Sequence, residues 1–161
     1  MDDINELAAE TGRALQSRGL LLAVAESCTG GGIAHAVTEI AGSSSWFECG
    51  FITYSNASKT EVLDVSAALI AQHGTVSEEI AAAMAEGALA TSNAHVTLST
   101  TGIAGPGGAV PGKPVGTVCF AWSRGDQTHN ERLVFAGDRQ AVRQQTVAHA
   151  LRGLLRFLGH A

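Results

Sequence analysis

The chain has 161 residues, of which 45% are hydrophobic and 16% charged, and its formal net charge at pH 7 is −5. This composition is typical of one compact domain and excludes a disordered chain. Its apolar runs are shorter than the ~20 residues of a membrane span, and it has no basic block that indicates a nucleic-acid partner. The acidic N-terminus does not resemble a signal peptide, so we expect a cytoplasmic protein with no membrane or nucleic-acid partner.

Hydrophobic periodicity and turn residues predict helices that alternate with strands. The expected helices cover residues 3–18, 29–40, 58–64 and 66–73, a segment capped by Ser77 and a final segment capped by Asp138. The expected strands cover residues 20–25, 46–54, 95–101, 115–122 and 128–135. Helices between the first three strands and a hairpin-like pair near the end predict an α/β fold. We expect a three-layer α/β/α sandwich with a mixed, mostly parallel five-stranded sheet.

The first predicted strand runs into Ser27, and three glycines follow shortly before the next helix. Glycine permits a tight turn and lets a ligand approach the main chain. The amide groups at a helix start carry the positive end of its dipole, so we expect them to face the space above Ser27. A hydroxyl beside such a site is suited to act as a nucleophile. The alternative is that Ser27 or Thr29 only caps the helix.

A second candidate segment, from Tyr54 to Lys59, follows the second predicted strand. Lys59 is either a solvated surface charge or, next to a serine nucleophile, a general base. A lysine pKa near ~10.4 leaves about one molecule in a few thousand neutral at pH 7. The role of base therefore requires burial or a positive field that lowers the pKa by about 3 units. Tyr54, the one tyrosine of the chain, could relay a proton between Ser27 and Lys59.

A glycine-rich loop follows the third predicted strand and ends in a sequence that imitates a Walker A motif. Pro114 stands where that motif needs Ser or Thr, and a strand follows instead of a helix, so a nucleotide-triphosphatase loop is excluded. The dinucleotide fingerprint G-x-G-x-x-G is absent as well. The loop is either a plain surface loop or a ligand site, and its place after a strand of an α/β sheet supports the second interpretation.

Cysteine and histidine spacing points to no other chemistry. Cys28 and His35 are separated by two helical turns, about 10 Å, which is too far for a catalytic pair. The three cysteines have no C-x-x-C spacing and the six histidines no paired metal spacing, so we expect no disulfide, metal or cofactor. Arg139, at the start of the last helix, is either a clamp for phosphate or carboxylate or an ordinary surface residue.

Taken together, these segments resemble the CinA C-terminal domain family. The resemblance rests on AESCTGG (25–31), WFECGFITYSN (46–56), GIAGPGG (102–108) and KPVGTV (113–118), with QHGTVS (72–77) and GDR (137–139) extending it. The glycine loop departs from the family at Gly107, where many members carry aspartate, and in the inserted residues 109–111. Over 1–161 we expect one CinA C-terminal-like amidase domain, in its stand-alone form.

The enzymatic members of this family are nicotinamide-nucleotide amidases. The resemblance therefore implies hydrolysis of nicotinamide mononucleotide, a small-molecule nucleotide, to nicotinic acid mononucleotide and ammonia. It implies a catalytic pair, Ser27 and Lys59, assisted by Tyr54, and a homo-oligomer (dimer or higher). The residues that we expect to contact the oxyanion or the nucleotide are Thr29, Gly30, Gly31, Thr101, Gly102, Gly105 and Arg139. The alternative function is a non-catalytic competence- or damage-inducible binding module that retains the nucleotide pocket.

Overall fold

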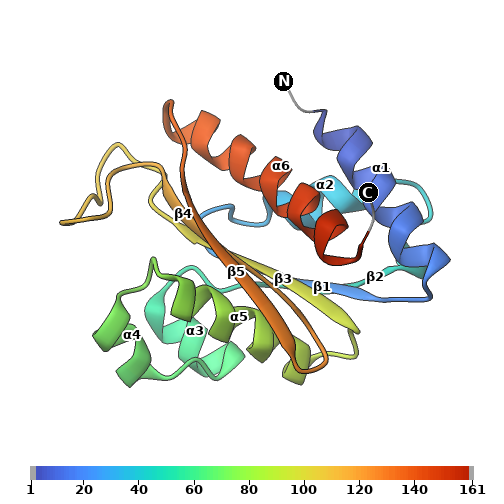
Figure 1. Ribbon diagram of the computed structural model, residues 1–161, viewed down its shortest axis with the longest axis horizontal. Coiled ribbons are helices and arrows are strands. Elements are labelled where there is room, and N and C mark those ends of the chain that lie inside the picture. Colours follow the sequence, from blue (N-terminus) through green and yellow to red (C-terminus); the bar gives the residue numbers. More distant parts are fainter. Residues whose placement is uncertain (1–2, 160–161) are drawn as a thin grey trace.

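A computed structural model of the chain describes residues 3–159 (Figure 1). The strands are β1 (Leu22–Glu26), β2 (Phe47–Ile52), β3 (Val96–Gly102), β4 (Thr117–Arg124) and β5 (Gln127–Val134). The helices are α1 (Ile4–Ser17), α2 (Gly32–Thr38), α3 (Asn56–Leu63), α4 (Ala67–His73), α5 (Glu78–Thr91) and α6 (Arg139–Phe157), with a 3-10 turn, η1 (Ser43–Ser45). The predicted elements are confirmed apart from their ends.

The largest difference from the expected elements is at α2. The helix begins three residues later than the sequence predicts, because Gly30 and Gly31 have φ angles of 58° and 100°. These values lie in the left-handed region, which favours glycine and is incompatible with a continuing right-handed helix. The chain from Ser27 to Gly31 therefore forms a loop between β1 and α2 rather than a helical turn.

The five strands form one sheet in the order β2-β1-β3-β4-β5. β1 pairs in parallel with β2 and β3, whereas β3 with β4 and β4 with β5 pair antiparallel. Four strands thus point the same way and β4 opposes them, which confirms the mixed sheet. Glu26 at the end of β1 is in register with Ile52 and Thr100. The segments that follow β1, β2 and β3 consequently emerge at one edge of the sheet.

Helices cover both faces of the sheet, which gives the predicted three layers (Figure 1). α1, α2 and α6 lie on one face, over a core that includes Leu98, Phe120, Trp122 and Leu151. α3, α4 and α5 lie on the other face, where alanines of α5 bring this helix close to the sheet. Ser77 and Asp138 cap α5 and α6, as predicted. Among the described residues, no helix is long and apolar enough to cross a membrane.

Close packing between α3 and α5 fixes the position of the segment that carries Lys59. The contact is made at Gly87 of α5, where an added Cβ would lie 2.1 Å from the carbonyl oxygen of Leu63 in α3. A backbone atom cannot move aside as a flexible side chain does. A side chain at position 87 would therefore push α3 away from the sheet.

We expect Gly87→Ala to lower the free energy of unfolding by about 1–2 kcal/mol. Overpacking costs about 1–3 kcal/mol, and a clash at 2.1 Å with a backbone atom belongs in the upper part of this range, so it outweighs the gain of roughly 1 kcal/mol from replacing a helical glycine by alanine. Urea denaturation would measure the change. Gly107→Ala is the matched control, because a Cβ there would meet nothing within 4 Å. A Gly87→Ala variant as stable as the wild type would contradict the close packing.

Candidate active site

Ser27 is the first residue after β1 and is nearly buried, with 7% of its surface exposed. Its backbone N–H donates to the carbonyl of Thr100 in β3, at 3.0 Å, so the residue is tied to the neighbouring strand. Arg143 of α6 donates from its guanidinium to the carbonyls of Cys28 and Thr29, at 3.1 and 3.2 Å. The loop that carries Ser27 is thus held from the sheet on one side and from α6 on the other.

Lys59 reaches the serine from α3, across the edge of the sheet. Ser55 caps α3 by accepting from the N–H of Ser58 at 3.1 Å, and this starts the helix directly after β2. The side chain of Lys59 is completely buried, and its Nζ lies 2.9 Å from Oγ of Ser27. The structure therefore brings together two side chains that are 32 positions apart in the sequence.

The surroundings of the lysine amine suit its neutral form. Nζ lies 2.6 Å from the carbonyl oxygen of Thr53 and 3.3 Å from that of Tyr54. A neutral amine donates its two N–H groups to these two carbonyls and turns its lone pair toward the hydroxyl of Ser27. Burial lowers the pKa of Lys59 from 10.5 to about 8. At pH 7 about one molecule in ten then carries the neutral amine, several hundred times more than for an exposed lysine.

Cys28, directly after Ser27, is not the nucleophile in this geometry. Burial raises the pKa of its thiol to about 12, so the thiolate is not populated near neutral pH. His35 lies on the surface of α2, where its Nε2 is 3.5 Å from the carboxylate of Glu39. The buried thiol and the exposed imidazole thus have separate surroundings, and the pair that lies within hydrogen-bond distance at this site is a serine and a lysine.

Arg139 connects two of the other predicted residues. One of its nitrogens donates to the hydroxyl of Tyr54 at 3.1 Å, and the other donates to the carbonyl of Gly105 at 2.8 Å. The side chain of Tyr54 is largely exposed, and its hydroxyl contacts Arg139. The backbone carbonyl of Tyr54 contacts the amine of Lys59 instead. Arg139 also lines a cavity of about 470 Å³ beside the glycine loop. The arginine is therefore tied to the rim of the site.

The hydroxyls of the two predicted threonines are used inside the protein. Oγ1 of Thr29 lies 2.9 Å from Oγ1 of Thr100, and Oγ1 of Thr101 donates to the carbonyl of Thr75 at 3.0 Å. At Gly102 an added Cβ would lie 2.8 Å from Val118, so the position is closely packed. These three residues build the framework of the site in this structure. Any contact with a ligand would come from their main chain.

The expectation that free helix amides face the space above Ser27 is wrong for α2. The N–H of Gly30 donates to the carbonyl of Ser27. Farther along, the N–H groups of Ile33 and Ala34 donate to the carboxylate of Glu26, at 3.0 and 2.9 Å. The sequence reasoning missed this role of Glu26. The signal was a carboxylate that directly follows an apolar strand and directly precedes the serine.

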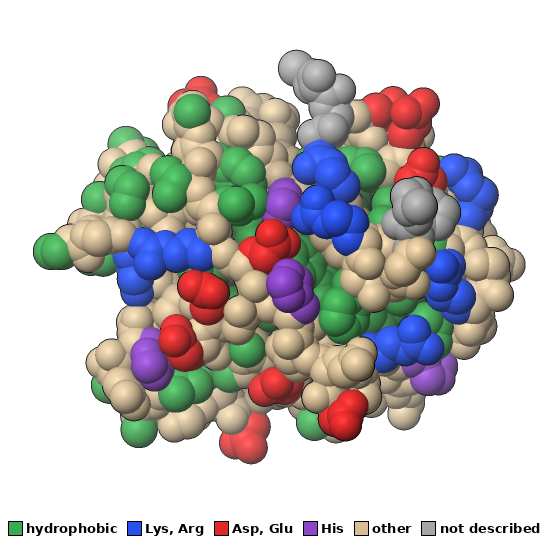
Figure 2. Space-filling view, in the orientation of Figure 1, with side chains coloured by type: hydrophobic (Ala, Val, Ile, Leu, Met, Phe, Trp, Pro, Cys, Tyr) green, Lys and Arg blue, Asp and Glu red, His purple; other side chains and the backbone are tan. Residues whose placement is uncertain are grey.

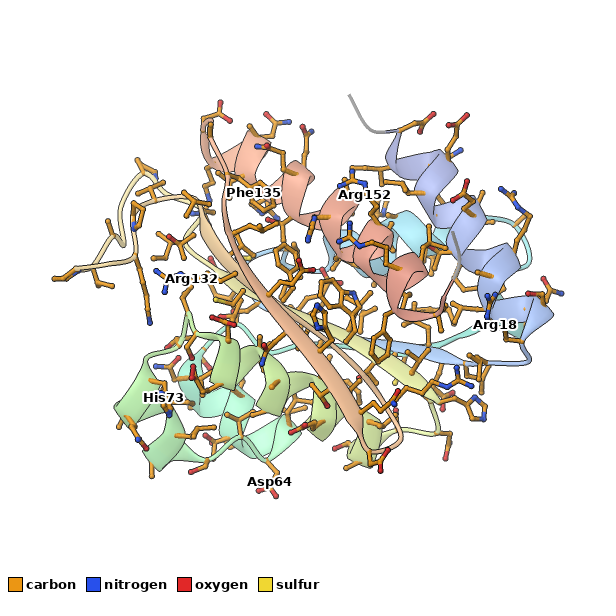
Figure 3. All side chains as sticks on the ribbon, viewed as in Figure 1. Arg18, Asp64, His73, Arg132, Phe135 and Arg152 are labelled. Carbon is orange, nitrogen blue, oxygen red and sulfur yellow. The ribbon has the colours of Figure 1, made fainter. Side chains whose placement is uncertain are left out.

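The glycine-rich loop that imitates a Walker motif does not form a phosphate loop. Val110 and Lys113 pair across a short turn, and Nζ of Lys113 donates to the carbonyl of His73, at 3.0 Å. Figure 3 shows Arg132 of β5 directed toward this loop, where it donates to the carbonyl of Gly112. In Figure 1 the loop projects from the body, and its hydrophobic end is visible at the left of Figure 2.

A buried serine–lysine pair at the carboxyl edge of an α/β sheet defines the class of this protein. Such a pair is typical of enzymes in which a hydroxyl is activated for attack on an acyl carbon. Residues 4–158 match the family model described as the CinA C-terminal domain, and the chain belongs to this family.

Similar proteins cover nearly the whole chain. The chain is 51% identical over 157 residues to the nicotinamide-nucleotide amidohydrolase PncC of Pseudomonas putida, with 98% of each chain covered. It is 48% identical to the PncC protein of Escherichia coli K12, covering 94% of this chain and 93% of that one. The crystal structure of competence damage-inducible protein A from Klebsiella pneumoniae superposes with a TM-score of 0.95 at 41% identity, with 99% of each chain covered.

The lowered pKa of Lys59 predicts how stability depends on pH. Between pH 8 and 10.5 the unfolded chain binds a proton at this lysine that the folded chain has lost, so stability rises with pH. We expect the unfolding free energy of the wild type to increase relative to that of Lys59→Met by at most about 1.4 kcal/mol per pH unit in this range. Urea denaturation at several pH values would measure it. A difference independent of pH would contradict the shift.

Proposed function

We propose that the chain is an amidohydrolase that converts nicotinamide mononucleotide to nicotinic acid mononucleotide and ammonia, a step of pyridine nucleotide recycling. The observation that carries the proposal is the 2.9 Å separation between Oγ of Ser27 and the buried Nζ of Lys59. The names of the relatives that match the chain over nearly its full length supply the substrate. The pyridinium ring of this substrate withdraws electrons from the carboxamide and favours attack on its carbon.

The proposed reaction has two halves. The neutral amine of Lys59 takes the proton of Ser27 while Oγ bonds to the carboxamide carbon. The tetrahedral oxyanion collapses, the C–N bond breaks, and the ammonium of Lys59 returns the proton to the departing ammonia. A water molecule, deprotonated in turn by Lys59, attacks the acyl-enzyme. The bond between Oγ and the acyl carbon breaks, the ammonium of Lys59 returns its proton to Oγ of Ser27, and the acid is released. We assign the oxyanion to the backbone N–H groups of Thr29 and Gly31, because the N–H of Gly30 between them already donates to the carbonyl of Ser27.

Arg139 is the residue that we assign to the nucleotide phosphate. A guanidinium is suited to bidentate contact with phosphate, and this one borders both the cavity of about 470 Å³ and Tyr54. We propose that Tyr54 relays the proton when substrate replaces its contact with Arg139. Main-chain groups of Thr101, Gly102 and Gly105 complete the contacts in this proposal.

Three further properties follow from the same proposal. We infer that residues 1–161 act as one domain and that the enzyme works in the cytoplasm, where its nucleotide substrate is produced. We also infer a homo-oligomer. Ile52, Val110 and Val134 are each more than half exposed, and large apolar side chains of this kind are often covered at a subunit interface.

The nucleophile and substrate are tested together. We expect Ser27→Ala to abolish ammonia release from nicotinamide mononucleotide with an unchanged circular dichroism spectrum, because no other group forms the acyl-enzyme. Lys59→Met should lose about 10²–10⁴-fold in kcat, the contribution that general base catalysis typically makes. The wild type should release ammonia from the mononucleotide and much less from nicotinamide or its nucleoside. Turnover retained without Ser27, or equal rates on all three compounds, would refute the proposal.

The pH dependence of the reaction reports the base. Only the neutral amine of Lys59 accepts a proton, and burial lowers its pKa to about 8. We expect kcat/KM to rise about tenfold per pH unit below pH 8 and to level off above it. Initial rates of ammonia release between pH 5.5 and 9.5 would measure the profile. A plateau that already begins near pH 6 would assign the base to another group.

A further inference from the structure

Glu26 is a completely buried carboxylate next to the proposed nucleophile. It ends β1, whose other residues, Leu22 to Ala25, are apolar and also buried. Removing a carboxylate from water costs several kcal/mol unless hydrogen bonds or charges compensate it. Here each carboxylate oxygen accepts one backbone N–H, from Ile33 at 3.0 Å and from Ala34 at 2.9 Å. The reaction proposed above makes no use of this group, so its burial calls for another explanation.

The two hydrogen bonds make Glu26 the cap of α2. The residue at the usual capping position, Gly31, has no side chain, and α2 has no side-chain cap from that position. The carboxylate of Glu26 satisfies the amides and the positive end of the helix dipole in its place. It therefore fixes the first turn of α2 directly against the end of β1. The distance between the end of β1 and the start of α2 is therefore fixed, and the five residues from Ser27 to Gly31 span it.

This anchoring matters because the bridge is intrinsically loose. Gly30 and Gly31 both have left-handed φ angles and give the loop access to many other conformations. The loop joins β1 to α2. Arg143 of α6 and Thr100 of β3 also bind the loop, but neither of them belongs to the two elements that it joins. The separation of β1 and α2 is fixed by Glu26.

Glu26 also contacts the segment that holds the lysine. Its backbone carbonyl accepts the N–H of Thr53 at 2.9 Å, and the carbonyl of Thr53 is the nearest acceptor of the Lys59 amine, at 2.6 Å. Glu26 thus binds the start of α2, directly precedes Ser27 in the chain, and binds the backbone of Thr53, whose carbonyl accepts from the lysine. We propose that Glu26 is a positioning residue for catalysis, whose carboxylate keeps Oγ of Ser27 within reach of Nζ of Lys59. This inference rests on the proposed roles of these two side chains.

Glu26→Gln tests the proposal. Glutamine has the same size but only one acceptor oxygen, so its NH₂ group would face one of the two helix amides as a second donor. We expect kcat to fall about 10²-fold, as a displacement near 1 Å does in an active site. KM should stay within threefold, because Glu26 does not line the proposed nucleotide site. The midpoint of the pH profile should stay near 8, since burial causes the pKa shift of Lys59.

Two control variants separate positioning from plain stability. Glu48→Gln makes the same substitution at a carboxylate that accepts a single N–H, that of Asn93 at 3.0 Å, and glutamine keeps one acceptor for it; its kcat should not change. Leu154→Ala removes a buried side chain of α6 and destabilises the fold without touching the loop. Each kcat is measured at a temperature where circular dichroism shows the variant folded. The proposal requires that Leu154→Ala keeps kcat within threefold of the wild type.

Each outcome is decisive. A folded Glu26→Gln enzyme with kcat within threefold of the wild type would overturn the proposal, as would an equal loss of kcat in Leu154→Ala. If Glu26→Gln does not fold, Glu26→Asp takes its place. Aspartate keeps the charge but is too short to reach both amides, and an unchanged kcat in that variant would likewise overturn it. Activity retained in Ser27→Ala would instead refute the proposed function, so the two failures are distinguishable.

Discussion

The fold of this site depends on one constraint, namely that a lysine amine is held out of water. Lys59 is completely buried, and the oxygens around its amine belong to two carbonyls and to the hydroxyl of Ser27, which carry no full charge. A carboxylate in the same place would stabilise the ammonium and keep the lysine protonated. Uncharged oxygens satisfy the N–H groups without that effect. Burial then lowers the pKa of Lys59 to about 8, and the amine is able to act as a base.

The sheet topology makes this burial possible. β1, β2 and β3 are parallel neighbours, so the loops after them meet at one edge although they are far apart in the sequence. α3 starts at that edge because Ser55 caps it, and Gly87 lets the helix lie close against α5. As a result the amine of Lys59 lies next to the loop that contains Ser27. The helix cap and the close packing are each local features, but together they bring into contact two side chains that are 32 positions apart in the sequence.

Local sequence signals predicted most of the fold. The strands, the caps at Ser77 and Asp138, and the common edge of the loops follow from hydrophobic runs and capping residues. The late start of α2 was missed, because periodicity does not reveal the left-handed angles of two glycines. The sequence suggested that Ser27 and Lys59 lie together, and the structure places them 2.9 Å apart, but the sequence did not reveal the partners of Thr29 and Thr101. Hydrogen bonds to residues in other elements decide how such hydroxyls are used, and a single sequence does not contain that information.

The carboxylate of Glu26 has a consequence for how an anionic substrate is bound. A helix N-terminus after a glycine-rich turn is a common phosphate site, and the sequence favours it here. The amides of Ile33 and Ala34 are already bound to an anion that belongs to the protein, so α2 offers them to no ligand. In a chain with a net charge of −5, a phosphate needs a local cation. The guanidinium of Arg139, at the start of α6 and beside a cavity, is suited to this need, and in the proposed mechanism the nucleotide phosphate would then be held apart from the serine–lysine pair.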